Sequence, residues 1–519
     1  HISLIEDNID SIIKFILFIP ATRNYDNEIF SSTLFKNLGF LAPRTKYIDT
    51  YVNGIKIKYI FQEKIAKEMI ENNGFIEGPI IEASQRFFWP EEKVNYVNSS
   101  LVQGRVSNQK WSTKNKYNLK KTTLALTKFN EGVIDDGSIH FNTNRLSYKN
   151  KMAQKENNEY QAIMSALGGF HGLVPTNTKY YYDPINLGFK PIYYDGNVNI
   201  LTNNSNNSIY KYPELFTYHS KVGAITAINK IENLNADIFN RELKKNGLDI
   251  PINEIQSLKN KLIKRLKYIS KIEVQEKGFN FKKVYFSRHK KGNEDKRLVF
   301  IDDDLNELKV CEFEVNKCDF ENLNLKEIER LLSGRLKKNG KFYIFASNNY
   351  DNYLNGNFFD TSLIISNKFK KQKLEDTEIL YSKNIGLLID NESKKIHFIQ
   401  NDNEQVVLFK NGSLKDWEIN FEGRKTNNLK NVENFFSGCM NFNEVKLHDV
   451  KIFIKDAMCN DAINFINSKG KISSLIVNGA QTDAIDFDFS NLEIDYINVS
   501  NALNDCVDMS YGNYLVKTV

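Results

Sequence analysis

Between His171 and Gly196, an asparagine precedes the first of two short apolar runs and an aspartate follows the second. Asn177 precedes the aromatic run 180–182, and Asp195 follows the run 191–194. Turn-forming residues at 183–188 separate the runs, which is typical of a strand–turn–strand unit. An Asn and an Asp held side by side in this way are the ligands that phosphoryl-transfer enzymes use for the metal ion on a nucleotide's phosphates. The alternative is a plain β-hairpin in which both residues merely end strands.

The segments before this unit predict a mixed α/β region. Residues 47–52 and 55–61 read as two strands joined by the hairpin turn Asn53-Gly54. Helical spacing predicts a helix over 62–72 and another over 145–170, which Gly168-Gly169 ends. The apolar stretch 12–19 is too short to cross a membrane and contains a lysine, so we expect a buried helix or strand there.

The segment 198–272 is predicted to be mostly helical. Its clearest helix follows Pro251 and places Ile255, Leu258, Leu262, Leu266 and Ile269 on one stripe. The opposite face is basic, with Lys259, Lys261, Lys264, Arg265 and Lys267. Such a face is typical of a solvated surface helix, and the alternative is binding to a membrane or a polyanion.

From about residue 278 short apolar alternations replace the helical pattern. They occur at 283–286, 298–301 and 342–345, with Asn, Asp, Gly and Lys between them, and predict an all-β region.

The chain ends in a repeat of 22 residues. The motif that starts at Asp461 returns at Asp483 and again at Asp505, and Ile472, Leu475 and Val477 each have an apolar counterpart 22 positions later. A less regular copy lies at 439–442. Two short strands per repeat predict the coils of a right-handed parallel β-helix, clearest over 438–515.

Composition sets few limits on the function. The chain has 519 residues and a net charge of +6, which argues for neither nucleic acid nor membrane binding. The five cysteines form no CxxC pair, so we expect neither a disulfide framework nor a zinc site, and we expect Cys459 and Cys506 to be small core residues. The first residue is His1 rather than Met, so we expect a fragment of a longer protein.

Three short motifs upstream resemble a known family. They are Leu38–Thr45 (LGFLAPRT), Tyr51–Gly54 (YVNG) and Tyr59–Glu63 (YIFQE). Together with Asn177 and Asp195-Gly196, they resemble the spore-coat kinase CotH family over residues 25–240, about half of the chain. The resemblance implies an atypical kinase fold that binds ATP through Mg²⁺ and transfers a phosphoryl group to a hydroxyl.

The resemblance also implies roles for single residues. Asp195 would chelate Mg²⁺ as the DFG-like aspartate, with Asn177 as the second ligand. A cation should neutralise the phosphates, and Lys64, directly after Glu63 at the nucleotide site, is the first candidate. Lys58 and Arg44 are alternatives.

One departure from the family's pattern bears on activity. The kinase catalytic loop places an aspartate base five residues before the metal-binding asparagine, and that position is Gly172 here. The neighbouring His171 has a side chain suited to act as the base instead. The alternatives are a packed, structural histidine and a pseudokinase that binds the nucleotide without turning it over.

The β-helix carries its own candidates for chemistry. Asp483, Asp486, Asp505 and Asp508 recur at fixed places of the repeat, and aligned carboxylates can bind Ca²⁺ or act on polysaccharides. Alternatively they end strands and accept hydrogen bonds from turn backbone. Tyr511 and Tyr514 could add a surface on which a sugar stacks.

The sequence therefore predicts a multidomain protein. We expect an α+β kinase-like domain over 1–250, a helical linker over 251–277, and a β-rich region over 278–519 that ends in the β-helix. The expected function is ATP-dependent phosphoryl transfer to a protein or cell-surface glycan in the bacterial envelope. The alternatives are a β-helix polysaccharide lyase or hydrolase with an accessory front domain, and a non-catalytic pseudokinase or surface scaffold. We expect no nucleic-acid partner and no integral membrane segment.

Overall fold

The chain divides into two compact units, which we describe separately. In this computed structural model, the first unit comprises 1–69 and 78–360, and the second comprises 70–77 and 361–519. This division differs from the predicted boundaries, since 251–277 and 278–360 fall within the first unit. The structure describes residues 2–4, 8–10, 12–84, 103–114, 116–133, 146–147, 150–174, 177–201, 208–211, 213–274, 295–301, 308–312, 318–320, 323–334, 337–338, 341–345, 369–401, 405–424 and 437–519.

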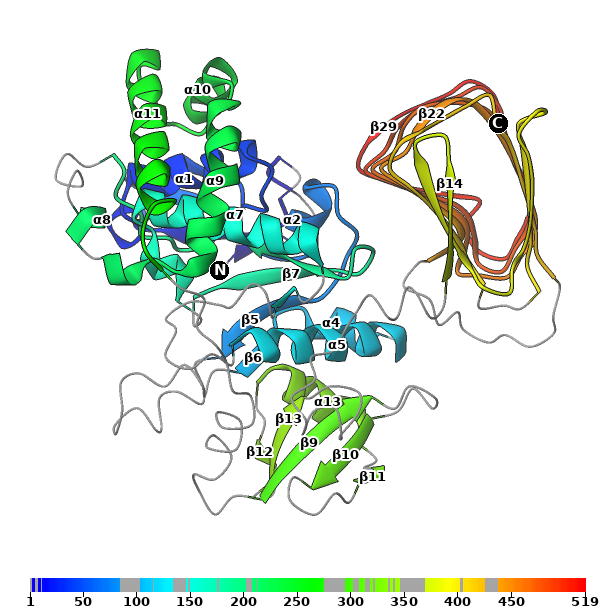
Figure 1. Cartoon of the computed structure of the whole chain (residues 1–519), viewed down its shortest axis with the longest axis horizontal. Helices are drawn as coiled ribbons and strands as arrows, with labels where there is room; N and C mark the ends of the chain where they lie inside the picture. Colours follow the sequence, from blue (N-terminus) through cyan, green and yellow to red (C-terminus); the bar gives the residue numbers. More distant parts are fainter. Residues whose placement is uncertain are drawn as a thin grey trace. The chain divides into compact units, whose positions relative to one another are not determined.

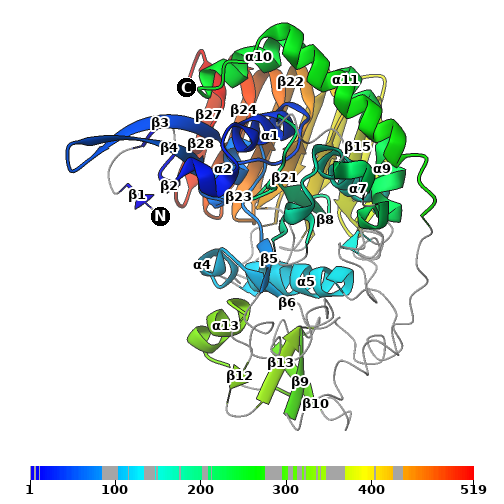
Figure 2. The same ribbon diagram turned by 90° about the vertical axis from the view of Figure 1, so that its left-hand side faces the viewer.

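The amino-terminal strands form a sheet in the order β1-β2-β4-β3. The strands are β1 (Ile2–Ser3), β2 (Lys14–Phe18), β3 (Thr45–Val52) and β4 (Ile55–Glu63). The hairpin predicted at Asn53-Gly54 is confirmed, since both residues have positive φ, 50° and 77°. Its tip projects from the rest of the unit (Figure 2).

The helix predicted over 62–72 begins later than expected. Gln62 and Glu63 continue β4, because they pair with Ile16 and Phe15 of β2. Only α2 (Lys67–Asn72) is helical in this stretch.

A second sheet carries the segment with the candidate site. It has the order β6-β5-β7-β8, with β5 (Ile80–Ser84), β6 (Gln103–Val106), β7 (Lys179–Asp183) and β8 (Gly188–Ile192). The strand–turn–strand prediction is confirmed, because β7 and β8 are antiparallel neighbours. The helix before them, α7 (Lys151–Leu167), is capped by the Asn150 side chain and ends at Gly168, which has φ +76°.

Helices supply most of the first unit's core. They include α1 (Asp26–Asn37), α4 (Gln109–Ser112), α5 (Lys116–Val133), α8 (Ser208–Lys211), α9 (Tyr218–Glu232), α10 (Ala236–Lys245) and α11 (Ile252–Ile269). Apolar side chains of α1, α7, α9, α10 and α11 share one buried cluster, and Figure 1 shows α7, α9 and α11 side by side.

The stripe predicted for α11 is buried as expected, but its opposite face is not uniformly solvated. Arg265 is 1% exposed and donates a hydrogen bond to the carbonyl oxygen of Ala166. Lys259 and Lys261 donate to the carbonyl oxygens of Glu232, Leu234 and Ile200. These basic side chains therefore hold neighbouring segments of the unit together.

A third sheet in the first unit has the order β11-β10-β9-β13-β12. Its strands are β9 (Asp295–Ile301), β10 (Leu308–Glu312), β11 (Cys318–Phe320), β12 (Lys337–Lys338) and β13 (Lys341–Phe345). The strands predicted at 298–301 and 342–345 are confirmed, and the one at 283–286 lies outside the described residues. The helix α13 (Leu325–Leu332) was not predicted.

The second unit is a parallel β-solenoid of about five turns, as the repeat predicts (Figure 1). A seven-stranded sheet has the order β14-β15-β18-β21-β23-β25-β28, and a nine-stranded sheet contains β16-β17-β20-β22-β24-β26-β29, with β19 and β27 paired beside it. The first sheet consists of β14 (Phe369–Leu374), β15 (Thr377–Ser382), β18 (Val407–Lys410), β21 (Gly438–Asn443), β23 (Asp461–Ile466), β25 (Asp483–Asp488) and β28 (Val507–Ser510). The second consists of β16 (Gly386–Asp390), β17 (Lys395–Ile399), β19 (Ser413–Lys415), β20 (Glu418–Glu422), β22 (Lys446–Ala457), β24 (Lys469–Ala480), β26 (Asn491–Ile494), β27 (Ile497–Ala502) and β29 (Asn513–Val516).

The solenoid core is a stack of equivalent side chains from successive turns. The rings of Phe409, Phe442, Phe465 and Phe487 stack with centroid spacings of 4.6, 5.0 and 5.2 Å. These spacings match the distance between hydrogen-bonded strands, so each turn buries the ring of the next.

The structure corrects the prediction for the cysteines. Cys439 and Cys459, both fully buried, form a disulfide, with Cα atoms 5.3 Å apart. Their separation of 20 residues is close to one turn of the solenoid, which brings them together. Cys506 is a free, exposed thiol rather than a core residue. Within the described part of the chain, no helix is long and apolar enough to cross a membrane.

Candidate functional site

The register of one hairpin brings Asn177 and Asp195 to the same end of a sheet. Lys179, at the start of β7, pairs with Ile192, at the end of β8. Asn177 lies just before this pair and Asp195 just after it. Because the strands are antiparallel, the start of β7 and the end of β8 lie side by side, and both residues leave the sheet at that end.

Two glycines hold the neighbouring turns together. His171 lies on the 3₁₀ turn Phe170–Leu173, and Gly172 of this turn packs against Gly196. A Cβ atom at Gly172 would come within 3.0 Å of the Gly196 Cα and 3.1 Å of the Tyr194 carbonyl oxygen. The absence of a side chain at Gly172 therefore allows the turn with His171 to meet the turn with Asp195.

His171, Asn177 and Asp195 form one cluster. The amide nitrogen of Asn177 lies 2.9 Å from Nε2 of His171, and it donates to the His171 carbonyl oxygen at 3.1 Å. The same ring nitrogen lies 3.8 Å from Oδ2 of Asp195. The Asn177 amide and the Asp195 carboxylate are thus no more than 6.7 Å apart, the sum of the two distances through His171. Asp195 has φ +43°, a conformation that non-glycine residues adopt rarely and that is enriched at functional sites.

Arg23 is a member of the cluster that sequence reasoning missed. Its Nη1 lies 2.8 Å from Oδ2 of Asp195, and its guanidinium group lies over the rings of Phe18 and Tyr194 at 4.1 and 5.6 Å. Arg23 ends the 3₁₀ turn Pro20–Arg23, which follows β2. No motif surrounds it in the sequence, and it lies 171 residues before Tyr194, so only the folded chain reveals the pair.

A second cation that sequence reasoning missed lies two residues after Asn177. Lys179 forms an ion pair with Glu82 of β5, and its ammonium group lies 4.6 Å from the ring centre of Tyr194. Arg105 of β6 binds the other oxygen of Glu82 at 2.8 Å. Burial lowers the pKa of Lys179 to about 8. The position of this lysine on the strand that follows Asn177 was a usable signal in the sequence.

A buried carboxyl group lies behind the cluster. Glu28 is 1% exposed and accepts hydrogen bonds from the Tyr193 hydroxyl at 2.8 Å and the Gln62 amide at 2.9 Å. Burial raises the pKa of Glu28 to about 6, while the bonds from Tyr193 and Gln62 and the charge of Arg23 oppose that rise. Glu28 therefore fixes the residue pair Tyr193–Tyr194 that leads into Asp195.

The other predicted nucleotide-site residues lie elsewhere. Both carboxylate oxygens of Glu63 bind the Arg44 guanidinium group, at 2.7 and 3.0 Å, and Glu63 is 2% exposed. Lys64 is exposed, and its backbone N–H donates to the Lys14 carbonyl oxygen. The alternative candidate Lys58 lies 3.9 Å from the ring centre of Tyr47. None of these side chains contacts His171, Asn177 or Asp195 among the described interactions.

The aspartates of the solenoid serve partly as links between turns. Asp483 accepts hydrogen bonds from the backbone N–H of Asp505 at 2.9 Å and from the Asn504 amide at 2.6 Å. The ring of Tyr514 packs against Phe487 at a centroid distance of 5.3 Å, and its hydroxyl lies 3.2 and 2.9 Å from the carbonyl oxygens of Phe487 and Ser510; a sugar-stacking role for Tyr511 and Tyr514 stays a prediction.

No preformed metal cage accompanies these groups. In the described ranges, no set of three or more His, Cys, Asp or Glu residues could hold a metal ion. No protein-family model matches the chain, and a search of curated protein sequences finds no match.

Proposed function

We propose that the first unit is a CotH-like, kinase-fold domain that binds ATP with Mg²⁺ at Asn177 and Asp195 and transfers a phosphoryl group to a hydroxyl of a protein or glycan. The observation that carries this proposal is the convergence of His171, Asn177 and Asp195 around one hairpin. This is the order in which the kinase fold presents its catalytic loop and metal-binding aspartate.

The donor set fits a metal that arrives on nucleotide phosphates. Mg²⁺ is commonly held by one or two carboxylates together with phosphate oxygens and water, rather than by an all-protein cage. Asp195 would supply the carboxylate, and Asn177 an amide oxygen. Arg23 pairs with the Asp195 carboxylate at 2.8 Å, so Mg²⁺ would have to displace this guanidinium group, which could then bind a phosphate oxygen. When bound, the metal would neutralise charge on the phosphates.

Lys179 is better placed than Lys64 to neutralise a phosphate. It lies beside Tyr194 at the edge from which Asn177 and Asp195 emerge, whereas Lys64 follows the far end of β4. Glu82 orients the Lys179 ammonium group, as a carboxylate orients the phosphate-binding lysine of protein kinases.

His171 is the residue available to accept a proton from the acceptor hydroxyl. Its side chain is 52% exposed, and its Nε2 faces Asn177 and Asp195. A substrate hydroxyl must displace the Asn177 amide to reach this nitrogen. The second candidate function, nucleotide binding without transfer, draws its support from Gly172, where packing against Gly196 leaves no room for the carboxylate base of the kinase fold.

Thermal stabilisation by ATP tests the binding step, since a ligand that binds only the folded state raises its stability. We expect ATP to raise the unfolding temperature only when Mg²⁺ is present. Asp195→Asn should abolish this increase. Asp49→Asn, which makes the same charge change at an exposed ion pair with Lys56, should retain it. An equal response in wild type and Asp195→Asn would exclude the proposed site.

Transfer is tested separately with γ-labelled ATP. Label should move to the acceptor with wild type and should be lost with His171→Ala, while Mg-ATP binding persists. Binding without any turnover by wild type would identify a pseudokinase.

A further inference from the structure

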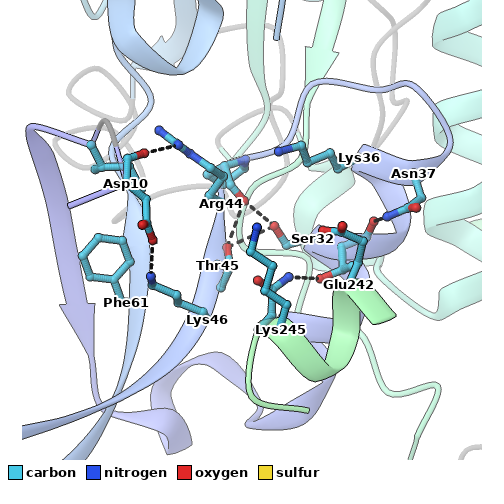
Figure 3. Close-up of a pocket in the computed structure, with 14 residues that line it drawn as sticks. Asp10, Ser32, Lys36, Asn37, Arg44, Thr45, Lys46, Phe61, Glu242 and Lys245 are labelled. Carbon is cyan, nitrogen blue, oxygen red and sulfur yellow. Dashed lines mark hydrogen bonds and ion pairs between the residues drawn. The ribbon is translucent and has the colours of Figure 1, made fainter. Parts of the chain in front are cut away.

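A cationic cavity lies in the first unit, apart from the His171–Asp195 cluster. It has a volume of about 200 Å³. The last turns of α1 and α10 and the start of β3 form its walls. Figure 3 shows Lys36, from α1, and Lys245, from α10, directed toward Arg44 and Thr45.

The acidic groups around the cavity are mostly committed to other partners. Asp10 pairs with Lys46 at 2.6 Å, and Glu63, behind the wall, pairs with Arg44 at 2.7 Å. Neither Lys36 nor Lys245 lies within ion-pair distance of a carboxylate among the described residues. Glu242 is the remaining acidic residue in the lining. The cavity therefore presents two ammonium groups without an ion-pair partner among the described residues, together with one carboxylate, that of Glu242.

The lysine side chains also repel one another. Burial lowers the pKa of Lys36, and the charges of Arg44 and Lys245 lower it further, while Glu63 and Glu242 oppose the effect. Repulsion of this kind is relieved when an anion lies between the cations.

The uncharged groups of the cavity wall bind one another. Thr45 donates to the Ser32 hydroxyl at 3.0 Å, Ser32 donates to the Pro43 carbonyl oxygen, and the Asn246 amide donates to the Thr33 hydroxyl at 3.0 Å. Recognition in the cavity is therefore left to the two ammonium groups. Lysine ammonium groups bind phosphate and sulfate oxygens as point charges.

We propose that this cavity is a second ligand site, which binds a tetrahedral oxyanion, either free or as the phosphoryl or sulfate group of a larger molecule, between Lys36 and Lys245. The volume admits such a group with a small substituent.

Buried hydrogen bonds connect the cavity to the candidate phosphotransfer site. The Gln62 amide donates to the Thr45 hydroxyl at 3.2 Å and to Glu28 at 2.9 Å, and Glu28 binds Tyr193. A continuous chain of hydrogen bonds therefore connects Thr45, beside the proposed anion, to Tyr193, which lies two residues before Asp195.

The test is a titration of the whole protein with inorganic phosphate against sodium chloride at matched ionic strength, followed by unfolding temperature and calorimetry. Wild type should show a saturable response to phosphate. The double variant Lys36→Gln/Lys245→Gln should bind about tenfold more weakly or worse, because two charge-assisted contacts are lost. All four lysines are exposed, so the control Lys151→Gln/Lys267→Gln removes the same charge from positions of the same burial class outside the cavity and should match wild type. Lys36→Arg/Lys245→Arg should preserve binding.

Further arms identify the source of the oxyanion and separate this site from the proposed function. Glucose 6-phosphate, with glucose as the neutral control, probes a phosphoryl group on a larger molecule, and a response to it alone would assign that source. Asp195→Asn should lose the Mg-ATP response and keep the phosphate response. The proposal is overturned if wild type responds to neither phosphate nor glucose 6-phosphate, or if both double variants lose the response equally.

Discussion

A buried aspartate should make the solenoid less stable as the pH rises. Asp461, on β23, is 6% exposed. Its pKa is raised from 3.8 to about 7, chiefly by burial and also by the charges of Asp483, Asp488 and Asp508, against an opposing hydrogen bond with Ser437. Asp483 is the residue that pairs with Asp461 on the next turn, so the repeat itself stacks these carboxyl groups.

The sign and size of the effect follow from this shift. Below pH 3.8 the carboxyl group is protonated in both the folded and the unfolded chain, and it contributes no pH dependence. Between pH 4 and 7 only the folded chain keeps the proton, so each pH unit lowers the free energy of unfolding by about 1.4 kcal/mol. The total loss approaches about 4 kcal/mol at pH 7 and then stops for Asp461. Burial and neighbouring aspartates raise the pKa of Asp486 further still, which extends the loss above pH 7.

The perturbation is Asp461→Asn, which removes the titration and keeps the side chain's shape. We expect the variant and wild type to be equally stable near pH 4, and the variant to be more stable near pH 7 by up to about 4 kcal/mol. Hydrogen exchange measured by mass spectrometry, corrected for the intrinsic pH dependence of exchange, should show this in peptides that cover 461–466 and 483–488. This local measurement suits a chain with two units, which need not unfold in one step.

A matched control lies in the bend between β26 and β27. Asp495 pairs with Lys517 at 2.7 Å and Lys471 at 3.1 Å, and these partners lower its pKa. Asp495→Asn should therefore reduce stability at neutral pH, which is the opposite sign for the same chemical change. If wild type and Asp461→Asn lose protection equally between pH 4 and 7, Asp461 is ionised in the folded protein and the reasoning fails.

Three further predictions concern the two cores and the candidate site. Phe465→Ala should lower the free energy of unfolding of the solenoid by about 3–5 kcal/mol, because the ring is fully buried between two others. Leu388→Ala, at a 64% exposed position, should lower it by less than about 0.5 kcal/mol. Denaturant unfolding measures both changes. Between pH 4.5 and 6 only the folded chain keeps Glu28 protonated, so the free energy of unfolding of the wild-type first unit should fall by about 2 kcal/mol as the pH rises. Glu28→Gln should abolish this fall, and an unchanged pH profile would contradict the prediction. Gly172→Ala should cost about 1–3 kcal/mol and weaken Mg-ATP binding by separating the two turns, which unfolding and nucleotide titration can measure.

The solenoid was predictable because its contacts repeat at a fixed interval. The 22-residue spacing pairs Ile472 with Ile494, Leu475 with Ile497 and Val477 with Val499, and the structure confirms all three as strand neighbours. In a parallel solenoid each residue packs on its equivalent in the next turn, so one interval determines both register and core. The Cys439–Cys459 disulfide was missed, because the first turns depart from that interval.

Local patterns failed where distant residues decide the outcome. Gln62 and Glu63 continue a strand instead of starting a helix, since β2, Glu28 and Arg44 bind their backbone and side chains. Helical spacing in 62–72 carries no information about these partners. Arg265 similarly looked solvated, because only tertiary structure brings the Ala166 carbonyl oxygen to it.

The candidate site combines both kinds of information. The positions of Asn177 and Asp195 follow from one local hairpin, whereas Arg23 and Glu28 reach the site from far along the chain. Local sequence could therefore indicate which groups might bind a metal, but not the charges that surround them.

Gly172 decides what this site can do with a hydroxyl. The backbone of Tyr194 and Gly196 closes the space where the carboxylate base of the kinase fold would lie, so Gly172→Asp should not create that base. Under the proposed function, the proton of the acceptor hydroxyl would pass to His171, whose Nε2 lies 3.8 Å from Asp195. Glutamine has no basic ring nitrogen, so His171→Gln should abolish turnover, where it occurs, while Mg-ATP binding persists. Turnover that survives His171→Gln would assign His171 to structure and refute its proposed role as the base.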